Sequence, residues 1–222
     1  MRKLLLHLDS STHPSAFDRI VALDGGADEV LSYGAVTEDA VRDLVHGAIF
    51  TRGPKDLHNT AIFIGGTDIA AGERLLAAAR AAFFGPMRVS LMLDSNGSNT
   101  TAVAAVAKLR QAGEVSGRRA VVTASTGPVG MRAAGLLAKA GADVVVTSRK
   151  PEGGAAAVAA VRQRFGAVVR AVMMAEQSQA ASVLEGVELL LNAGGAGVRL
   201  VPRDAWMGRP GLRAVADVNA VP

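Results

Sequence analysis

The sequence contains no cysteine. This absence excludes a disulfide framework, a thiolate nucleophile and a zinc site built from cysteine ligands. Histidine is also scarce: the four histidines show no paired spacing typical of a metal site, and no serine–histidine–carboxylate triad can be assembled from the sequence. The residues therefore predict neither a hydrolase nor a metalloenzyme.

Long apolar runs and blocks of like charge are missing as well. The most apolar region, residues 119–148, is interrupted by Arg132, Lys139 and Asp143, so no stretch reaches the about 18 uncharged residues of a membrane span. The 24 basic and 20 acidic side chains leave a net charge of +4 and are scattered along the chain. This balance helps to attract an anionic ligand but gives no nucleic-acid signal. We therefore expect a cytoplasmic protein with neither a membrane nor a nucleic-acid partner.

Aromatic residues make up only 4% of the chain, whereas 50% of its residues are hydrophobic and 25 of its 222 residues are glycine. The hydrophobic fraction is ample for a sizeable core and excludes global disorder. Because aromatics are few, the core must be built from alanine, valine and leucine, as in closely packed α/β layers. A length of 222 residues allows about one to two domains.

Short apolar runs alternate with helical patterns in the first half of the chain. Good capping residues, Thr37 and Ser98, precede two of the helical patterns. A strand, a helix and a strand in this order imply parallel strands joined by a crossover. The pattern predicts strands at residues 4–8, 61–64 and 89–93, and helices over residues 17–24, about 38–45, 68–83 and 98–109.

A polar, glycine-containing segment from Gln111 to Arg119 is interpreted as the seam between two domains. Residues 1–112 are expected to form an α/β domain for the substrate. Residues 113–222 are expected to form a doubly wound dinucleotide-binding domain of the Rossmann type. In this second domain the alternation predicts strands at residues 120–124, 144–147, 168–173, 187–192 and 213–217, and helices over 129–140, 155–165 and 178–184.

The turn after the strand at residues 120–124 carries the clearest chemical signal. Gly127 and Gly130 match the second and third glycines of the dinucleotide fingerprint, while Ser125 stands in place of the first. A glycine lets the backbone approach a pyrophosphate, and the free amides of the following helix then face the phosphates. The alternative is a plain strand-to-helix turn that binds nothing. We predict a dinucleotide phosphate site made by Ser125, Thr126, Gly127, Pro128, Val129 and Gly130.

The choice of dinucleotide depends on the end of the next strand. In NAD-binding units an acidic residue about 20 positions further on holds the ribose hydroxyls, but Ser148, Arg149 and Lys150 occupy that place here. A hydroxyl and two cations suit a 2′-phosphate, so the sequence predicts NADP as the cofactor. The alternative is that both cations are ordinary solvated loop charges. Ala193 and Gly194, in a glycine-rich turn after a later strand, are predicted to pass close to the nicotinamide; the alternative is a plain loop.

A polar block from Asp94 to Thr101 follows the strand predicted at residues 89–93. It places carboxylate, amide and hydroxyl groups at the carboxyl end of a sheet, where open α/β sheets bind ligands. Taken alone, the block is equally typical of a capped turn. Asp24, which is followed by two glycines, is a weaker candidate because this segment also suits the end of a helix.

Several long and unusual strings make the chain recognisable. In the first half they are Phe17-Asp18, Asp24-Gly25-Gly26-Ala27-Asp28, Ile49-Phe50-Thr51-Arg52-Gly53 and Met92-Leu93-Asp94-Ser95-Asn96-Gly97-Ser98-Asn99-Thr100-Thr101; in the second they are Thr126-Gly127-Pro128-Val129-Gly130-Met131-Arg132 and Asp217-x-Asn219-Ala220. With these strings the chain resembles the NADP-dependent methylene-tetrahydromethanopterin dehydrogenases of methylotrophic bacteria, some of which also accept methylene-tetrahydrofolate. The resemblance extends over essentially all 222 residues.

The resemblance implies an oxidoreductase of one-carbon metabolism. In formaldehyde oxidation such an enzyme passes a hydride from the methylene carbon of a reduced pterin to NADP⁺, giving the methenyl form. Because the pterin nitrogens stabilise the product cation, the enzyme needs orientation of two rings more than acid–base chemistry.

Particular residues receive roles from this resemblance. A carboxylate near the cleft favours the developing positive charge; Asp94 is the candidate for it and Asp24 the reserve. The residues expected to orient the pterin are Asn96, Ser98, Asn99 and Thr101. Asp217 and Asn219 are expected in the cofactor site.

Two further expectations concern the whole protein. Relatives continue for several dozen residues beyond the segment at 217–222, so we expect the dinucleotide domain to lack their C-terminal segment. The family is similar to a trimeric assembly, which implies a homo-oligomer. Three interpretations stay open: a methylene-tetrahydromethanopterin dehydrogenase, a dehydrogenase or reductase acting mainly on a folate or another pterin, and a non-catalytic NADP-binding paralogue.

Overall fold

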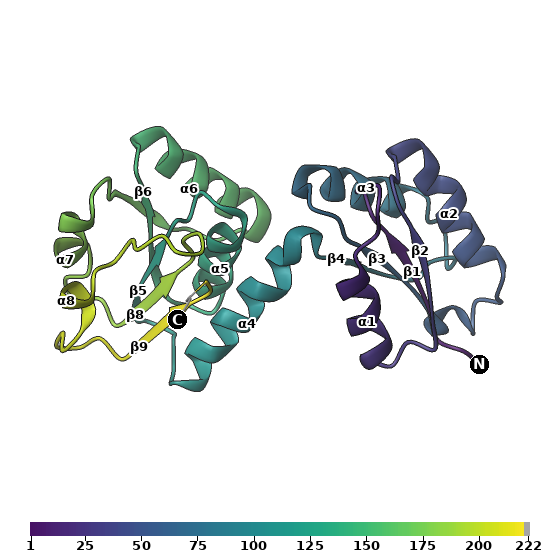
Figure 1. The fold of residues 1–222 in the computed structure, drawn as a ribbon. Helices are drawn as coiled ribbons and strands as arrows, with labels where there is room; N and C mark the ends of the chain where they lie inside the picture. The colour runs from purple at the N-terminus through teal and green to yellow at the C-terminus, as the bar shows by residue number, and fades with distance from the viewer. Residues whose placement is uncertain (220–222) are drawn as a thin grey trace. The chain divides into compact units, whose positions relative to one another are not determined.

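The computed structural model describes residues 1–219 and shows an α/β chain with two parallel sheets (Figure 1). The chain divides into two compact units, the first formed by Met1–Gly97 and the second beginning at Ser98. Each unit has its own sheet and its own core. The expected α/β class, with a Rossmann-type second half, is confirmed. Ala220, which ends one of the matched strings, lies outside the described residues.

The first unit contains a four-stranded sheet in the order β2-β1-β3-β4, with all neighbours parallel. Its strands are β1 (Leu4–Leu8), β2 (Glu29–Tyr33), β3 (Thr60–Ile64) and β4 (Ser90–Leu93). Its helices are α1 (Ala16–Asp24), α2 (Glu38–Phe50) and α3 (Ile69–Ala81), with short 3-10 turns at Leu57–Asn59 and Ser95–Gly97. The strand order reverses between β1 and β3, and open α/β sheets bind ligands beyond the carboxyl ends of strands at such a point.

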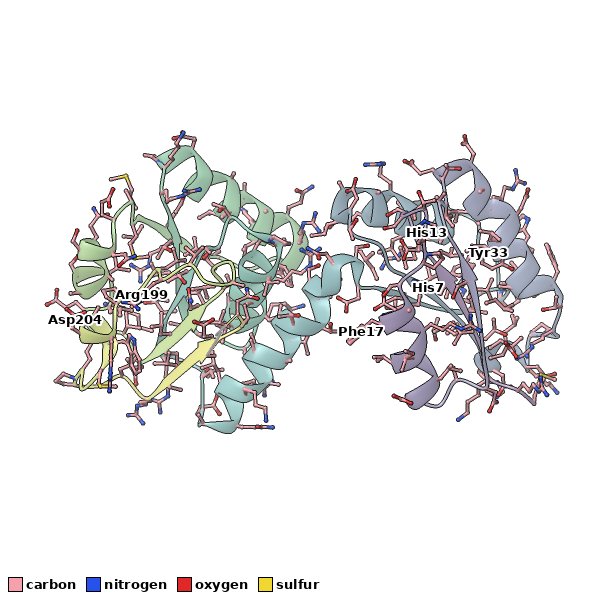
Figure 2. The ribbon with its side chains drawn as sticks, viewed as in Figure 1. His7, His13, Phe17, Tyr33, Arg199 and Asp204 are labelled. Atoms are coloured by element: carbon pink, nitrogen blue, oxygen red, sulfur yellow. The ribbon has the colours of Figure 1, made fainter. Side chains whose placement is uncertain are left out.

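Side chains on the strands of this sheet alternate between its two faces. Leu6, Leu8, Ile62 and Ile64 are buried in one core with residues of α2 and α3. The neighbouring helix α1 buries none of its own residues, and it lies close to His7 of β1 (Figure 2). The face beside α1 is therefore the one on which a polar group can lie near solvent.

The second unit contains a five-stranded sheet in the order β7-β6-β5-β8-β9, again with all neighbours parallel. Its strands are β5 (Arg119–Thr123), β6 (Asp143–Ser148), β7 (Arg170–Met173), β8 (Leu189–Asn192) and β9 (Ala214–Asp217). Its helices are α4 (Ser98–Gln111), α5 (Pro128–Lys139), α6 (Pro151–Phe165), α7 (Ala180–Val183) and α8 (Arg203–Trp206), with a 3-10 turn at Gln177–Gln179. The strand order reverses between β5 and β8.

Both faces of the second sheet are covered. Val122 and Val146 belong to a core shared with α4, α5 and α6. Their neighbours Val121 and Val145 belong to a second core shared with α7 and α8. Central parallel strands that are buried on both faces have continuous apolar sequences, which explains the valine runs of β5 and β6.

The boundary between the units differs from the one expected. The sequence places the seam after residue 112, whereas the first unit ends at Gly97. The reason is packing: α4 contacts α5 and β9, and its Ala102, Val106 and Leu109 belong to the core of the second unit. The polar segment that follows α4 is thus a loop within the second unit.

Most elements lie where the sequence predicts them. The bounds of β1 are those expected, and Thr37 is the N-cap residue of α2. Ser98, expected as a cap, is instead the first residue of α4. Two elements were not predicted, the edge strand β2, in which only Val30 is buried, and the single-turn helix α8. Among the described residues, no helix combines the length and the apolar character needed to cross a bilayer.

Candidate functional site

The turn between β5 and α5 has the geometry of an anion-binding cradle. Ala124 adopts a left-handed conformation with a φ of 51°. A Cβ atom at Gly130 would lie 2.7 Å from the carbonyl oxygen of Ala124, so only glycine allows this close packing of helix on turn. Gly127 is the N-cap of α5, gives no side-chain hydrogen bond to the helix start, and is followed by Pro128. The backbone amides and the positive dipole end of α5 are therefore suited to an anion.

Ser125 occupies the place of the first fingerprint glycine without opening the turn. Its side chain is buried, and its hydroxyl donates to the carbonyl oxygen of Val122 at 2.5 Å. Through this hydrogen bond the Ser125 side chain satisfies a backbone carbonyl at the end of β5. Gly127 and Gly130 keep their places in the turn.

A cavity of about 300 Å³ lies beside this turn, at the reversal of strand order between β5 and β8. Its lining residues are Ala124, Thr126, Thr147, Ser148, Arg149, Met174, Gly194, Gly195, Val198 and Leu200. The structure therefore brings together the turn between β5 and α5, two of the predicted specificity residues and the glycine-rich turn after β8. Val129 and Gly130 follow in the first turn of α5, and Ala193 packs against the core.

The residues after β6 give this cavity a basic edge. The Ser148 hydroxyl donates to the carbonyl oxygen of Lys150 at 2.7 Å, which shapes the loop. Arg149 is exposed and lines the cavity, whereas Lys150 is the N-cap of α6 and is absent from the lining. None of the lining residues is acidic. Of the two predicted cations, Arg149 is the one placed to meet an anionic group.

Asp217 and Asn219 form hydrogen bonds with the glycine-rich turn after β8 and with the residue before it. Asn192 at the end of β8 donates to Asp217 Oδ2 at 2.8 Å and accepts from the Thr123 hydroxyl at 2.5 Å. Asn219 Nδ2 donates to the carbonyl oxygen of Gly194 at 2.6 Å. The predicted pair thus holds the turn that lines the cavity and does not line the cavity itself. The role of Asn192 was not foreseen, because its partners come from strands far apart in the sequence.

In the first unit, the polar block after β4 is tied to the end of β3. The backbone amide of Asn96 donates to the carbonyl oxygen of Gly66 at 2.7 Å, and the Ser95 hydroxyl donates to that of Gly65 at 2.8 Å. Asn96 has a left-handed φ of 55° and an exposed side chain. Asp94 is nearly buried, with 9% of its surface exposed. Asp94 and Asn96 therefore share one edge, beyond the carboxyl ends of β3 and β4.

The other predicted pterin residues lie on α4, in the second unit. Ser98 is buried at 1% exposure, and Thr101 is half-buried. Asn99 Oδ1 accepts from Arg132 Nε of α5 at 2.5 Å. Asn99 is thus engaged in the contact between α4 and α5 within the second unit.

The expectation for Asp24 needs correction. This residue ends α1, and α1 runs back from the carboxyl end of β1 to the amino end of β2. Asp24 is therefore at the opposite edge of the sheet from Asp94, where it is exposed. The two glycines after it end the helix: the Gly25 amide donates to Val21, and Gly26 has a φ of 96°.

A cluster that sequence reasoning missed lies at the carboxyl end of β1. His7 is buried at 1% exposure, with Nε2 at 3.6 Å from Asp9 Oδ2 and 3.9 Å from Asp18 Oδ2. Burial lowers the pKa of His7, although both carboxylates oppose this effect. Burial raises the pKa of Asp18. The signal in the sequence was a histidine inside an otherwise apolar strand, but only the fold shows that Asp18 faces it.

Comparison with known proteins identifies the family. Residues 16–96 match the family model described as methylene-tetrahydromethanopterin dehydrogenase, N-terminal. The chain is 49% identical over 223 residues to the bifunctional protein MdtA of Methylorubrum extorquens, with all of this chain and 77% of the relative covered. It is 31% identical over 230 residues to the NAD(P)-dependent methylenetetrahydromethanopterin dehydrogenase of the same organism, with the same coverage.

The chain belongs to the methylene-tetrahydromethanopterin dehydrogenase family.

Solved structures place this member of the dehydrogenase family among α/β enzymes of one fold. Shikimate 5-dehydrogenase from Listeria monocytogenes matches with a TM-score of 0.56 at 15% identity, over 97% of this chain and 78% of that one. The 5-ketofructose reductase of a Gluconobacter strain matches with a TM-score of 0.57 at 17% identity, over 99% and 79%. At these identities the likeness concerns the fold alone.

Proposed function

We propose that this protein is an NADP-dependent methylene-tetrahydromethanopterin dehydrogenase that transfers a hydride from the pterin to NADP⁺ in the oxidation of formaldehyde-derived one-carbon units. The observation that carries the proposal is the similarity, over the whole chain, to a relative named as an NAD(P)-dependent dehydrogenase of this pterin. We assign the first unit to the pterin and the second to the cofactor.

The residues around the cavity of the second unit fit a dinucleotide phosphate. A side chain at Gly130 would collide with the backbone of Ala124 and Ser125, so the glycine keeps the start of α5 close to the turn. The start of α5 would hold the pyrophosphate through backbone amides. Arg149, exposed on the cavity edge, would hold a 2′-phosphate by charge-assisted hydrogen bonds. When bound, the cofactor supplies a hydride acceptor.

The protein itself has little proton chemistry to perform. The methylene C–H bond breaks with its electron pair, and the lone pair of the adjacent ring nitrogen forms the C=N⁺ bond of the methenyl product. Because no proton leaves, no general base is required. We infer that the nearly buried Asp94 favours the developing positive charge and that Asn96 helps to orient the pterin.

The test is the nicotinamide absorbance after purified protein is mixed with NADP⁺ and methylene-tetrahydromethanopterin. Parallel runs use NAD⁺ and methylene-tetrahydrofolate. We expect fast reduction of NADP⁺ with the methanopterin substrate, and slower turnover for Asp94→Asn with little change in pterin affinity. Reduction of NADP⁺ with methylene-tetrahydrofolate but not with the methanopterin substrate would indicate a folate dehydrogenase instead. Binding of NADP⁺ without reduction by any pterin would indicate a non-catalytic paralogue.

A further inference from the structure

The cluster around His7 has an unpaired group at its centre. His7 Nε2 is buried and has no hydrogen-bond partner. Two carboxylate oxygens, from Asp9 and Asp18, lie at 3.6 and 3.9 Å from it, within ion-pair reach but beyond hydrogen-bond distance. With two carboxylates in front of Nε2, this nitrogen carries the proton of the neutral ring, and Nδ1 faces the Ser32 hydroxyl at 3.5 Å. A buried N–H group without an acceptor is costly.

The carboxylates of Asp9 and Asp18 differ in their hydrogen-bond partners and in their exposure. Both oxygens of Asp9 accept from backbone amides, of Ser11 at 2.7 Å and of Ser15 at 3.1 Å, and Asp9 is buried at 1% exposure. Asp9 therefore holds the loop that leads from β1 to α1. The Asp18 side chain keeps 25% of its surface exposed. Of the two, Asp18 is the carboxylate that a ligand can reach.

Two glycines after β3 make room for this arrangement. A Cβ atom at Gly65 would lie 2.7 Å from His7 Nε2 and 3.2 Å from Asp18 Oδ2. A Cβ atom at Gly66 would lie 2.8 Å from Asp9 Oδ1. The backbone after β3 thus comes within contact distance of all three side chains because it has none of its own.

The cluster occupies the position at which a ligand is expected in this unit. His7 and Asp9 lie at the carboxyl end of β1, and Gly65 lies at the carboxyl end of β3, where the strand order reverses. Asp94, after β4, is close enough to raise the pKa of Asp18 through its charge, in addition to the larger effect of burial. This edge of the sheet is therefore acidic and suits a ligand group rich in hydrogen-bond donors.

The pterin carries such a group. The aminopyrimidinone ring of a pterin presents a ring N–H and an amino group side by side, and a carboxylate offers two oxygens at matching spacing. We propose that Asp18 receives this two-donor edge and that His7, whose Nε2 lies 3.9 Å from Asp18 Oδ2, is the positioning residue that orients this carboxylate electrostatically. The inference rests on the proposed function and names the group that recognises its substrate.

The proposal predicts how the affinity for the pterin changes with pH. The groups around the His7 ring are Asp9 on its own strand, Asp18 from α1, the Ser32 hydroxyl from β2 and the Phe63 ring from β3. Protonation of Asp18 removes an acceptor, so pterin affinity decreases at acidic pH. Because His7 lowers the pKa of Asp18, loss of His7 moves this decrease to higher pH.

The first experiment measures binding of tetrahydromethanopterin without its one-carbon unit, by calorimetry, to the intact chain. Asp18→Asn replaces one acceptor oxygen by an amide NH₂ and removes the charge, so we expect the dissociation constant for the pterin to rise about 10- to 100-fold, as for the loss of hydrogen bonds to a charged group. Asp43→Asn, an exposed carboxylate on α2, is the matched control and should bind like the parent.

The second experiment separates positioning by His7 from a general effect on folding. His7→Leu removes the donor, and we expect the KM for the pterin to rise about tenfold, with kcat and the KM for NADP⁺ nearly unchanged. Its acid limb of kcat/KM should move to higher pH. His7→Gln keeps an amide donor and should restore most of the pterin affinity. His58→Gln, an exposed histidine at the amino end of β3, is the control.

The outcomes distinguish this inference from the proposed function. Turnover by the parent, together with unchanged pterin binding in Asp18→Asn, would reject the inference and leave the function intact. A uniform loss of kcat/KM at every pH in His7→Leu, without rescue by His7→Gln, would reject the positioning role. Absence of pterin binding and of turnover in the parent would reject both.

Discussion

Gly130 determines how closely α5 can approach the phosphate turn. Replacement by alanine would place a Cβ atom 2.7 Å from the carbonyl oxygen of Ala124 and 2.9 Å from Ser125 Cα, both backbone atoms that cannot move aside. We expect Gly130→Ala to lower the free energy of unfolding by about 1–3 kcal/mol and to weaken NADP⁺ binding. Urea unfolding and fluorescence titration measure the two effects. Gly127→Ala, with its nearest atom at 3.3 Å, should be milder; equal effects would contradict this explanation.

Arg149 is the side chain on which the proposed preference for NADP⁺ depends. It lines the cavity of the second unit, and none of the other lining residues is charged. We expect Arg149→Ser to raise the KM for NADP⁺ about 10- to 100-fold, the effect of losing charged hydrogen bonds, with little change for NAD⁺. Steady-state kinetics with both cofactors checks this expectation, with the exposed Arg162→Ser on α6 as control. An equal change in the KM for NADP⁺ and for NAD⁺ would show that Arg149 does not bind the 2′-phosphate.

His7 makes stability depend on pH. Burial lowers its pKa from the ordinary 6.5, so below that pH the unfolded chain takes up a proton that the folded protein does not yet accept. The free energy of unfolding therefore falls as the pH falls below 6.5, and this loss is absent above it. In His7→Gln the loss should be smaller, by up to about 1.4 kcal/mol per pH unit. Urea unfolding between about pH 5 and 7 measures this pH dependence. If the free energies of unfolding of parent and variant changed in parallel with pH, the role of His7 would be refuted.

At the scale of elements, the contact between α4 and α5 explains why the unit boundary precedes α4. Arg132 is buried at 4% exposure and donates to Asn99 Oδ1 at 2.5 Å and to the carbonyl oxygen of Pro128 at 3.1 Å. A buried guanidinium needs such acceptors. Asn99, which the sequence predicts to orient the pterin, thus accepts a hydrogen bond within the α4–α5 helix pair.

The same contact yields a prediction. Asn99→Ala takes an acceptor from the Arg132 guanidinium, and we expect the free energy of unfolding to fall by about 1.5–3 kcal/mol, with the KM for the pterin unchanged. Thermal unfolding and kinetics test both parts. Val103→Ala, at an exposed position of α4, should change neither. A rise in the KM without loss of stability would return Asn99 to the pterin site.

At the scale of the whole molecule, each unit carries its own spectroscopic reporter. The single tryptophan, Trp206, is in the second unit, and the single tyrosine, Tyr33, is in the first. NADP⁺ at about 100 times its dissociation constant should stabilise the unit that binds it by about 2.7 kcal/mol. We expect this shift in the unfolding curve of Trp206. The Tyr33 curve, followed in Trp206→Phe, should move much less, and equal shifts would show that the two units unfold together.

Local patterns in the sequence were sufficient for most of the fold. The apolar run of β1, the cap Thr37 and the turn from Ser125 to Gly130 each depend on residues a few positions apart. Strand β2 was missed because an edge strand with one buried residue has almost no apolar pattern. The cavity-lining roles of Ser148, Arg149 and Gly194 followed from strand ends alone, since parallel strands end at one edge.

By itself the sequence determined the α/β class, the glycine-containing turn between β5 and α5 and the basic strand end, because helix and strand periods, turn glycines and capping residues act over short distances along the chain. The matched strings indicated the family. Only the tertiary structure decided that Asp24 is at the far edge, that α4 belongs to the second unit, and that His7 meets Asp18. These facts depend on strand order and on the packing of distant segments, which no local pattern encodes.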